Sequence, residues 1–411
     1  MSAAKLTRAV MVAAALSLAL GACAANSGGS SSGGSSPSSG INLPALTTLN
    51  VPADAANPAG DGKAKCSGLS IAFGGAETGP NAQLGLNILY GVQTALDAHN
   101  TANPGCQVQL KKFDTQGSSS AAPGLVTQMA SEQDIVGAVG LAFSGESAAT
   151  GGIFQQAGLV HITASATNPT LTQNGWTTFF RGLGNDNAQG PAAAKFITGT
   201  LKDSKVCVVQ DDSAYGKGLA ASITPALGSA NDTACNDKVT TGQKDFSSTV
   251  NKVNAAKADA IFYSGYYAEA APLDQQLVQA GFKGTFVGPD GVKDPQFLKL
   301  AGSAASNAIF TCPCTDGALV PSFASAYAKV ANGASPGTYS VEGYDIATIL
   351  LKGIDAGNTT RAQLVNYVKN YSGDGLSKHF QWGPTGELTS VQVYAYAVQN
   401  GKIVAVKELS S

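Results

Sequence analysis

Short apolar runs alternate with helical patterns along most of this chain, and this alternation constrains the fold more than any other feature. The expected strands are Leu69–Phe73, Val108–Phe113, Ile135–Ala142, Leu159–Thr163, Phe179–Leu183, Lys205–Gln210, Lys238–Thr241, Ala258–Tyr263 and Thr285–Val287. Strands that alternate with helices at this spacing predict parallel sheets with helical crossovers. The gap between the fifth and sixth strands separates two series, so we expect two similar α/β lobes with a cleft between them.

The helical patterns continue after the last of these strands, where the alternation breaks. The expected helices are Leu84–Ala98, Tyr215–Leu227, Phe246–Val253, Ala268–Ala280, Phe323–Val330, Val341–Ile354 and Ala362–Tyr371. The chain then ends in two apolar runs within Val391–Glu408, joined at Asn400-Gly401, a pair typical of a tight hairpin. Late helices and a final hairpin are easiest to place if the chain crosses between the lobes more than once.

The N-terminus has the features of an exported lipoprotein. Lys5 and Arg8 precede an uncharged run, Ala9–Leu20, which is too short to span a bilayer but suits a signal-peptide core. The run ends in Leu20-Gly21-Ala22-Cys23, which resembles a bacterial lipobox. We therefore expect residues 1–22 to be removed and Cys23 to carry a lipid that anchors the protein to the outer side of the cell membrane. An ordinary signal peptide with an incidental Cys23 is the alternative.

Residues 23–65 are expected to form a flexible tether. Every residue from Ser27 to Gly40 is Ser or Gly except Pro37, and the chain stays rich in Pro, Ala and Asn as far as Gly62. Such composition favours a flexible linker. A globular head on this tether would stand clear of the membrane surface.

Charge and cysteine content narrow the classes of partner. Lys and Arg number 25 against 27 Asp and Glu, with no basic block, so nucleic acid is not an expected partner. Six further cysteines are an even number in an exported chain, which favours disulfides over metal ligands. Fifteen pairings are possible, and proximity in sequence favours Cys66 with Cys106, Cys207 with Cys235 and Cys312 with Cys314. A metal site at Cys312-Pro313-Cys314 is the alternative for the last pair.

Ser144, in "LAFSGES", tests whether the chain is an enzyme. A nucleophilic serine on a sharp turn needs small residues two positions before and after it, and Glu146 breaks that pattern. None of the three histidines stands in a recognisable catalytic pattern. The sequence also lacks a phosphate-binding glycine motif with its lysine and any histidine array for a metal. We therefore expect no enzymatic activity and no cofactor.

Polar residues gather instead where expected strands end. Ser144, Ser165 and Thr167 follow two neighbouring strands of the first series, where hydroxyls and helix N-terminal amides suit a carboxylate. Asp290 follows a strand of the second series and suits an ammonium group. Each of these residues also has an ordinary interpretation as a helix cap or turn residue.

Aromatic and aliphatic residues near the same loops suit the rest of a small ligand. Tyr215, Tyr266 and Tyr267 are expected to contact or close over it, while Phe143 and Leu84 would line an apolar side-chain pocket. Roles in the core or on helix faces are the alternative for all five.

Several segments together resemble the type I periplasmic binding proteins that serve branched-chain amino acid ABC transporters. They occur in the order typical of that family and cover roughly residues 67–410: "GPNAQLG", "AGLVHITASATNPTLT", "FRGLGNDNAQGPAAAKFI", "DDSAYGKGLA", "KDFSSTVNKV" and "GPDGV". The resemblance implies two Rossmann-like lobes joined by three crossing segments that close on an amino acid. By position it assigns Ser144, Ser165 and Thr167 to the α-carboxylate, and Tyr215 and Asp290 to the α-ammonium.

This chain departs from the family pattern at two positions of the expected site. Asp290 stands where members often carry a glutamate, which keeps the charge but shortens the reach, and Leu84 stands where an aromatic residue is common. The expected lobes are residues 66–186 with 316–388 and residues 187–315 with 389–411. The expected function is capture of leucine, isoleucine or valine for an ABC importer. A sensory receptor of the same fold and a binder of a short amide or urea are the alternatives.

Overall fold

The structure is a computed structural model that describes residues 43–49 and 51–409. The expected signal peptide, Cys23 and the tether up to residue 42 lie outside the described residues. Within the described part of the chain, no helix is both long and apolar enough to cross a membrane.

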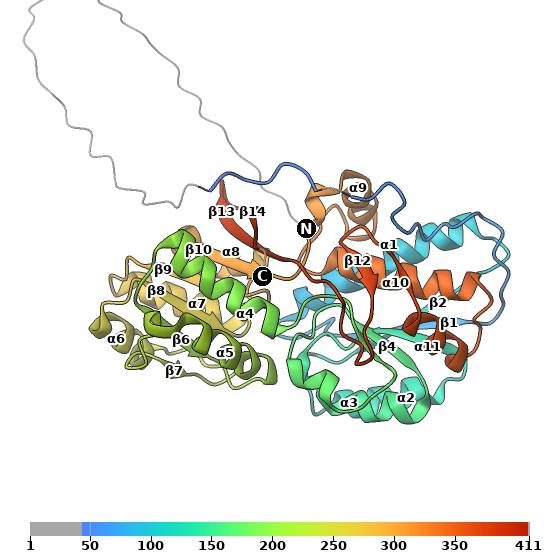
Figure 1. The fold of residues 1–411 in the computed structure, drawn as a ribbon, viewed down its shortest axis with the longest axis horizontal. Helices are drawn as coiled ribbons and strands as arrows, with labels where there is room; N and C mark the ends of the chain where they lie inside the picture. The colour runs from blue at the N-terminus through green and yellow to red at the C-terminus, as the bar shows by residue number, and fades with distance from the viewer. Residues whose placement is uncertain (1–42, 50, 410–411) are drawn as a thin grey trace, which may run out of the picture. The chain divides into compact units, whose positions relative to one another are not determined.

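A parallel five-stranded sheet forms the centre of the first lobe, in the order β2-β1-β3-β4-β5 (Figure 1). Its strands are β1 (Ser70–Gly75), β2 (Gln109–Asp114), β3 (Ile135–Gly140), β4 (Val160–Thr163) and β5 (Phe179–Arg181). All five were expected from the first series of apolar runs. Every residue of β1 and β3 is buried, as a continuous apolar run in a sheet covered on both faces requires.

Helices from both ends of the sequence cover this sheet. They are α1 (Ala82–Ala102), α2 (Ala122–Ser131), α3 (Ser144–Ala157), α9 (Pro321–Val330), α10 (Ser340–Asp355) and α11 (Arg361–Lys369). Helix α10 packs on α1, and α11 packs on β3 and β4. A ribbon of β11 (Ser372–Asp374) and β12 (His379–Gln381) follows, and these elements together are called the first lobe.

The second lobe is built on a seven-stranded sheet in the order β14-β13-β10-β9-β8-β6-β7. Its strands are β6 (Val206–Gln210), β7 (Asp237–Lys238), β8 (Ala260–Ser264), β9 (Thr285–Gly288), β10 (Ala308–Cys312), β13 (Val393–Gln399) and β14 (Lys402–Leu409). The last two form the expected hairpin, and positive φ angles at Asn400 and Gly401 account for the Asn-Gly signal.

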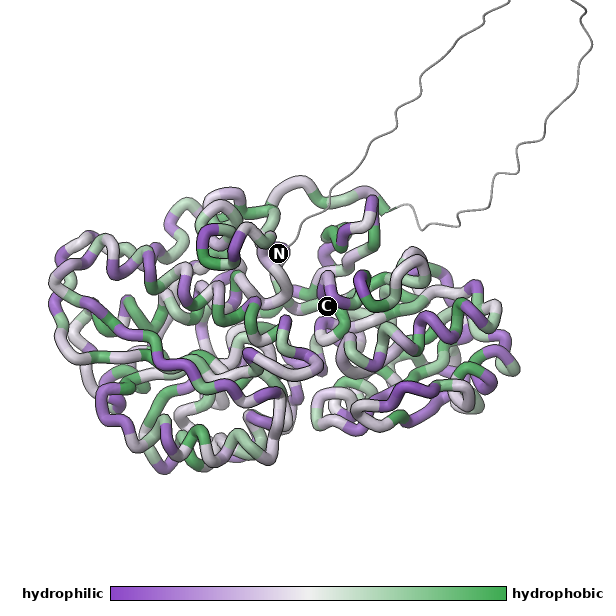
Figure 2. The backbone as a smooth tube through the Cα atoms, turned by 180° about the vertical axis from the view of Figure 1, so that it is seen from behind, coloured by the Kyte–Doolittle hydropathy of each residue, from purple (hydrophilic) through white to green (hydrophobic). Residues whose placement is uncertain are grey.

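The remaining helices belong to the second lobe. They are α4 (Asp186–Lys195), α5 (Ala214–Leu227), α6 (Ser247–Ala256), α7 (Tyr267–Gln279) and α8 (Pro295–Ala301). Five short helical turns are distributed over the two lobes: η1 (Pro169–Gln173), η2 (Phe196–Leu201), η3 (Gly228–Ala230), η4 (Gly302–Asn307) and η5 (Gly317–Leu319). Helix α4 packs on α5. Polar and apolar residues alternate along the outer helices (Figure 2), as expected of helices with one face on a sheet.

Two strand predictions in the second lobe need correction. The expected strand Lys238–Thr241 is reduced to the two residues of β7, because Thr241 and Gly242 donate their backbone N–H groups to the side chains of Asp212 and Glu269 instead of to a strand. Strand β10 was not expected, although it is fully buried and joins the parallel strand β9 to the antiparallel β13.

The chain crosses between the two sheets three times, as expected. The crossings follow β5, follow β10 and precede β13. They lie side by side, since a Cβ atom placed on Gly184 would stand 3.2 Å from the Cβ of Pro313 and 3.3 Å from that of Val391. The boundaries expected at residues 186, 315 and 388 stay predictions, because the crossing segments pack on one another.

Three disulfides join Cys66 to Cys106, Cys207 to Cys235 and Cys312 to Cys314. These are the pairings that proximity in sequence favours. The last disulfide occupies both sulfur atoms that the alternative metal site would need.

The expected tether is wrong for its C-terminal part. Residues 43–49 and 51–65 lie against the folded body, in the blue trace that runs along the upper side of Figure 1. Leu46 donates its backbone N–H to Ala405, and Ala56 donates to Asp374. The leucine side chains, with Val51 and Ala64, supply the apolar contacts in a stretch that is otherwise rich in alanine and proline.

Candidate functional site

The expected carboxylate-binding residues meet at one edge of the first sheet. Ser144 follows β3, and Ser165 and Thr167 follow β4, which pairs with β3 in parallel. All three side chains are buried. Because the carboxyl ends of neighbouring parallel strands lie together, separate loops bring these hydroxyls to one place.

Ser144 is the first residue of α3 but not its cap. The backbone N–H of Phe143 donates to Glu146 Oε2 at 3.0 Å, so a carboxylate inside the helix closes this end. Burial raises the pKa of Glu146 to about 7. The Ser144 hydroxyl accepts from the N–H of Asn168 at 3.3 Å. No hydrogen bond of the described residues uses its proton, which leaves a donor for a ligand.

Ser165 and Thr167 differ in what they can offer. Ser165 Oγ donates to the carbonyl of Ala142 at 2.5 Å, so its proton is already used. Thr167 Oγ1 is buried and has no partner within the described residues. A buried polar group without a partner is costly, and a ligand group at Thr167 would remove that cost. Thr167 is therefore the stronger side-chain donor.

An ion pair between a buried arginine and a half-buried glutamate holds the Thr167 loop in place. Arg181, at the end of β5, makes two 3.0 Å hydrogen bonds to the carboxylate of Glu387. The same guanidinium donates to the carbonyl oxygens of Ala166 and Asn168, on either side of Thr167. Arg181 lowers the pKa of Glu387 through its charge. This planar clamp fixes the loop without using the Thr167 side chain.

Asp290 lies at the end of β9 in the second lobe and is fully buried. Its Oδ1 accepts from the hydroxyl of Tyr215, which is on α5, and its Oδ2 accepts from the hydroxyl of Tyr339, both at 2.5 Å. Burial raises the pKa of Asp290, while these two hydrogen bonds oppose the shift. A cation beside this carboxylate would favour its charged form.

Tyr339 was not among the expected site residues. It precedes α10, in a left-handed backbone conformation with φ of 69°, and its hydroxyl reaches Asp290 from the first lobe. The strand-end rule that located the other residues does not apply to it, because no strand of either parallel sheet precedes this loop. A non-glycine residue at positive φ leaves no clear signal in the sequence.

Asp186 is a second acid that sequence reasoning missed. It is the first residue of α4, it is fully buried, and neither carboxylate oxygen has a hydrogen-bond partner in the described chain. Burial raises its pKa to about 8, with a further rise from the nearby charge of Asp290. The Thr167 hydroxyl lies near this carboxyl group and opposes the rise in its pKa, although the two groups do not meet the geometry of a hydrogen bond. Unpaired polar atoms from both lobes therefore converge between Thr167 and Asp290.

The two lobes touch across this site. The rings of Phe143 and Tyr266 meet edge to face, with centroids 4.9 Å apart. Asn168 Nδ2 donates to the carbonyl of Ala214 at 2.7 Å, and the N–H of Gln83 donates to the hydroxyl of Tyr267 at 3.3 Å. The site is thus enclosed between the lobes.

The expected apolar residues fall at this interface or behind it. Phe143, Tyr215 and Tyr266 are buried together with Leu84 in one core cluster that spans both lobes. The ring of Tyr215 lies 5.1 Å from that of Tyr266. Leu84 is placed in the first turn of α1, and no contact assigns it to the ligand side, so its binding role stays a prediction.

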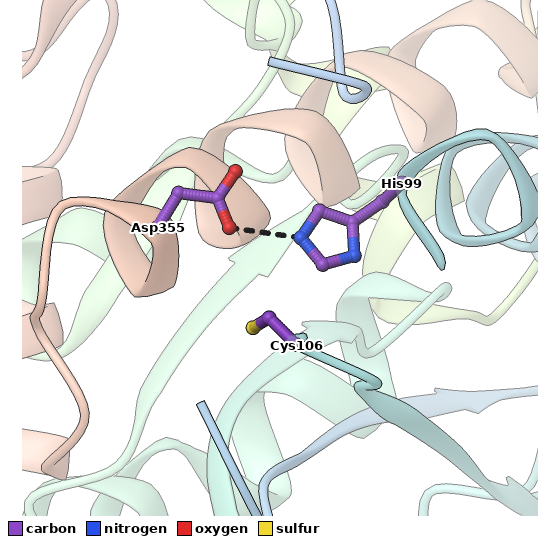
Figure 3. Close-up of side chains that lie close together, drawn as sticks. All are labelled: His99, Cys106 and Asp355. Carbon is purple, nitrogen blue, oxygen red and sulfur yellow. Dashed lines mark hydrogen bonds and ion pairs between the residues drawn. The ribbon is translucent and has the colours of Figure 1, made fainter. Parts of the chain in front are cut away.

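The histidines lie elsewhere. His161, in β4, is stacked on Phe154 with centroids 3.9 Å apart, and burial lowers its pKa to about 3. His379 contacts Asp374 at 2.6 Å. His99 contacts Asp355 at 2.8 Å (Figure 3). Each imidazole is thus engaged away from Ser144.

His99, Cys106 and Asp355 form the one group of three potential metal ligands within the described residues (Figure 3). Cys106 is bonded to Cys66, so its sulfur is not a free thiolate. The hydrogen bond between His99 and Asp355 connects α1 to the C-terminal end of α10. The group is better described as a structural link between these two helices than as a metal centre.

Comparison with known proteins identifies a family and several relatives of this chain. The family profile described as periplasmic binding protein matches residues 68–402. The Leu/Ile/Val-binding protein BraC3 of Rhizobium johnstonii is 31% identical over 338 residues, covering 80% of this chain and 91% of the relative. A Pseudomonas aeruginosa protein named for binding leucine, isoleucine, valine, threonine and alanine is 29% identical and covers 70% of this chain and 78% of its own length.

Solved structures agree on the fold. The branched-chain amino acid transporter substrate-binding protein LivJ of Streptococcus pneumoniae, in complex with isoleucine, superposes with a TM-score of 0.77 at 26% identity, over 83% of this chain and 99% of that one. A solute-binding protein of an ABC transporter from R. palustris, in complex with benzoate, has a TM-score of 0.75 at 18% identity, over 83% of this chain and 96% of that one. The second likeness concerns the fold alone.

Proposed function

Because this chain belongs to the periplasmic binding protein family, whose members are extracytoplasmic solute-binding receptors, we propose that it captures a branched-chain amino acid between its lobes. It then delivers the amino acid, chemically unchanged, to the permease of an ABC importer. Relatives named for leucine, isoleucine and valine support this choice of ligand.

One observation carries the proposal: hydrogen-bond donors of the first lobe face buried carboxylates of the second lobe across the interface, and Thr167 Oγ1 and both Asp186 oxygens have no partner within the described residues. The first lobe offers the hydroxyls of Ser144 and Thr167, together with the N-terminal amides of α3. The second offers the carboxylate of Asp290, and Asp186 lies between them. An α-amino acid has one anionic and one cationic group, so it fits both sets. A short amide or urea would leave Asp290 without a counter-charge.

Closure follows from this division. An amino acid whose carboxylate is held by one lobe and whose ammonium is held by the other binds the closed form better than the open form. The difference in affinity sets how far the ligand shifts that equilibrium. A permease would then recognise the closed, loaded receptor.

The test is to identify what the purified protein binds. Mass spectrometry of the ligand released on denaturation should show unmodified leucine, isoleucine or valine. Calorimetry should show tight binding of leucine and strong losses for leucinamide, which lacks the carboxylate, and for 4-methylpentanoate, which lacks the ammonium. Equal affinity for all three compounds would overturn the zwitterion site, and a converted product would indicate an enzyme. A sensory receptor would bind leucine but fail to support its uptake in cells.

The lipid anchor is a separate part of the proposal and rests on the sequence "LGAC" at positions 20–23. Cells that express the full chain and are fed radiolabelled palmitate should label it, and Cys23→Ala should abolish the label. The ligand site is more than 100 residues away in sequence, so the same variant should bind leucine normally. A label that survives Cys23→Ala would contradict anchoring at this residue.

A further inference from the structure

The segment of residues 43–49 and 51–65, called the strap below, contacts the second lobe at its N-terminal end. The N–H of Leu46 donates to the carbonyl of Ala405 in β14 at 2.7 Å. The side chain of Gln399, in β13, donates to the carbonyl of Leu43 at 2.7 Å. The Leu43 side chain packs on a cluster that includes Ile309. The two hydrogen bonds and the Leu43 contact therefore attach the strap to the hairpin β13–β14, and this attachment is called the grip below.

A few residues later the same strap is attached to the first lobe. Leu49 and Val51 pack on a cluster formed around α9 and α10, whose buried members are Val320, Phe323, Tyr327, Ala331 and Val341. The N–H of Ala56 donates to Asp374 at 2.6 Å, and Asn103 bonds both Ala59 and Ala64. The disulfide between Cys66 and Cys106 follows directly. This attachment includes a covalent bond, whereas the grip on the second lobe does not.

Between the two attachments the strap passes over the crossing segments. Leu46 lines two cavities, of about 380 Å³ and about 350 Å³. The first also contains Ser390 and Gln392 from the third crossing, and the second contains Thr315 and Asp316 from the second crossing. Leu46 is half-buried, packs on the main core cluster and borders both open spaces. A half-buried contact beside open space can detach without a rearrangement of the core.

The short link between the attachments couples them. Leu46 contacts the second lobe and Leu49 contacts the first, so only three residue steps separate the two lobes along the strap. A fully extended chain spans about 3.3 to 3.6 Å per residue, or about 10 Å for this link. If the lobes rotate so that these points separate further, one attachment must release. The weaker attachment, on β13–β14, is expected to be the one.

We propose that the strap is a fourth, detachable connection between the lobes, and that its grip on β13–β14 stabilises the closed arrangement. Its role does not depend on which solute binds. If the ligand binds only the closed form, its apparent affinity is reduced in proportion to the closed fraction of the free protein. Loss of the grip lowers that fraction, so it weakens binding without any change in the ligand site.

Two variants of the full chain separate coupling from simple stability. Leu46→Pro combined with Leu43→Ser removes the N–H donor and the leucine contact on the second lobe. Insertion of four glycines between Thr47 and Thr48 keeps both attachments but gives slack to the link. Lys63→Ala is the matched control, because Lys63 is an exposed strap residue beyond the link, paired only with the exposed Asp61.

The readout is the distance between the lobes, measured by electron paramagnetic resonance. Spin labels are placed at Thr127→Cys on α2 and Asn251→Cys on α6, both exposed, with Cys23→Ser to leave no other single cysteine. Both strap variants should shift the ligand-free protein toward the longer distances of the open form, and saturating leucine should restore the closed distance. Calorimetry of Leu46→Pro with Leu43→Ser should show leucine affinity lowered about tenfold, as the loss of one hydrogen bond and a leucine contact implies.

The outcomes separate this proposal from the proposed function. If leucine does not bind the parent protein, the assignment of the ligand fails while the distances still test the strap. Unchanged distances in both variants would overturn the strap proposal, whatever the ligand. A shift with Leu46→Pro and Leu43→Ser but none with the glycine insertion would show that the grip acts within the second lobe only, which also overturns coupling.

Discussion

The two faces that enclose the site use opposite chemistry. The first lobe presents hydroxyls and helix amides, all of them donors, on loops after β3 and β4. The second presents a carboxylate, Asp290, with two tyrosine hydroxyls directed at it. Neither face alone neutralises a zwitterion, so full binding requires both lobes to close on one ligand.

The faces also differ in how far they are satisfied without a ligand. Asp290 has a donor on each oxygen, whereas Thr167 Oγ1 has none. The two tyrosine hydroxyls thus hold Asp290 in place before a ligand binds, whereas the Thr167 hydroxyl gains a hydrogen-bond partner only when a ligand binds. We expect removal of the charge to cost more than removal of the hydroxyl, and the predictions below test that order.

The largest effect is expected from Asp290→Ala. Removal of one partner from a buried charge pair costs about 3 to 5 kcal/mol, so leucine affinity should fall more than about 100-fold by calorimetry. Asp274→Ala is the matched control, because Asp274 is equally buried in the second lobe but lies on α7. Circular dichroism checks that both variants fold. Undiminished affinity in Asp290→Ala would show that Asp290 does not bind the ammonium group of the ligand.

We expect low pH to reduce the stability of the first lobe through His161, which lies in β4, the strand that precedes Ser165 and Thr167. Its pKa is about 3 in the folded protein, against an ordinary value near 6.5, because burial disfavours the charged form. The unfolded chain therefore binds the proton first as pH falls below 6.5, and stability is lost from there down to about pH 3. By linkage this amounts to about 2 kcal/mol at pH 5.

The measurement is the free energy of unfolding at pH 7 and pH 5 for the parent and for His161→Leu. The variant should lose less stability on acidification than the parent, whatever its stability at pH 7. An identical loss in both proteins would show that His161 does not carry the acid sensitivity.

The sequence predicted these two faces unequally. Loops after parallel strands follow from apolar runs, so Ser144, Thr167, Tyr215 and Asp290 were found at strand ends and do lie at the interface. Tyr339 and Asp186 were missed, since one precedes a late helix and the other begins a crossing helix. Their positions depend on how the chain crosses between lobes, which local patterns do not encode.

The sheets could be predicted from the sequence more readily than the strap. All five strands of the first sheet were predicted, and β1 and β3 gave the clearest signal because buried parallel strands are nearly continuous apolar segments. The strap was predicted as part of a flexible tether because this stretch is rich in proline, alanine and asparagine and has no helical or strand periodicity. A few apolar side chains, Leu43, Leu46, Leu49 and Val51, attach it together with hydrogen bonds, and such isolated residues carry no periodic signal.

A smaller effect is expected from Thr167→Val, which keeps the shape of the side chain and removes only the hydroxyl. A hydrogen bond to a charged group contributes about 1.5 to 3 kcal/mol, so leucine affinity should fall about 10- to 100-fold. Ser165→Ala is the comparison, because its hydroxyl already donates to Ala142 and should cost the ligand less than about threefold. Equal losses in both variants would contradict the distinction between the two hydroxyls.

The smallest effect on affinity is expected from Tyr339→Phe, because its two consequences oppose each other. The Tyr339 hydroxyl reaches Asp290 Oδ2 from the first lobe, so it ties the lobes together even without a ligand, and its loss should lower the closed fraction. The same loss frees Oδ2 to accept from the ligand's ammonium, which strengthens binding in the closed form. We expect leucine affinity to change less than about threefold, while thermal unfolding of the free protein shows a loss of about 1 kcal/mol. A loss of affinity similar to that of Asp290→Ala would mean that the hydroxyl contacts the ligand directly, and the division of donors and acceptors between the two faces would then fail at this residue.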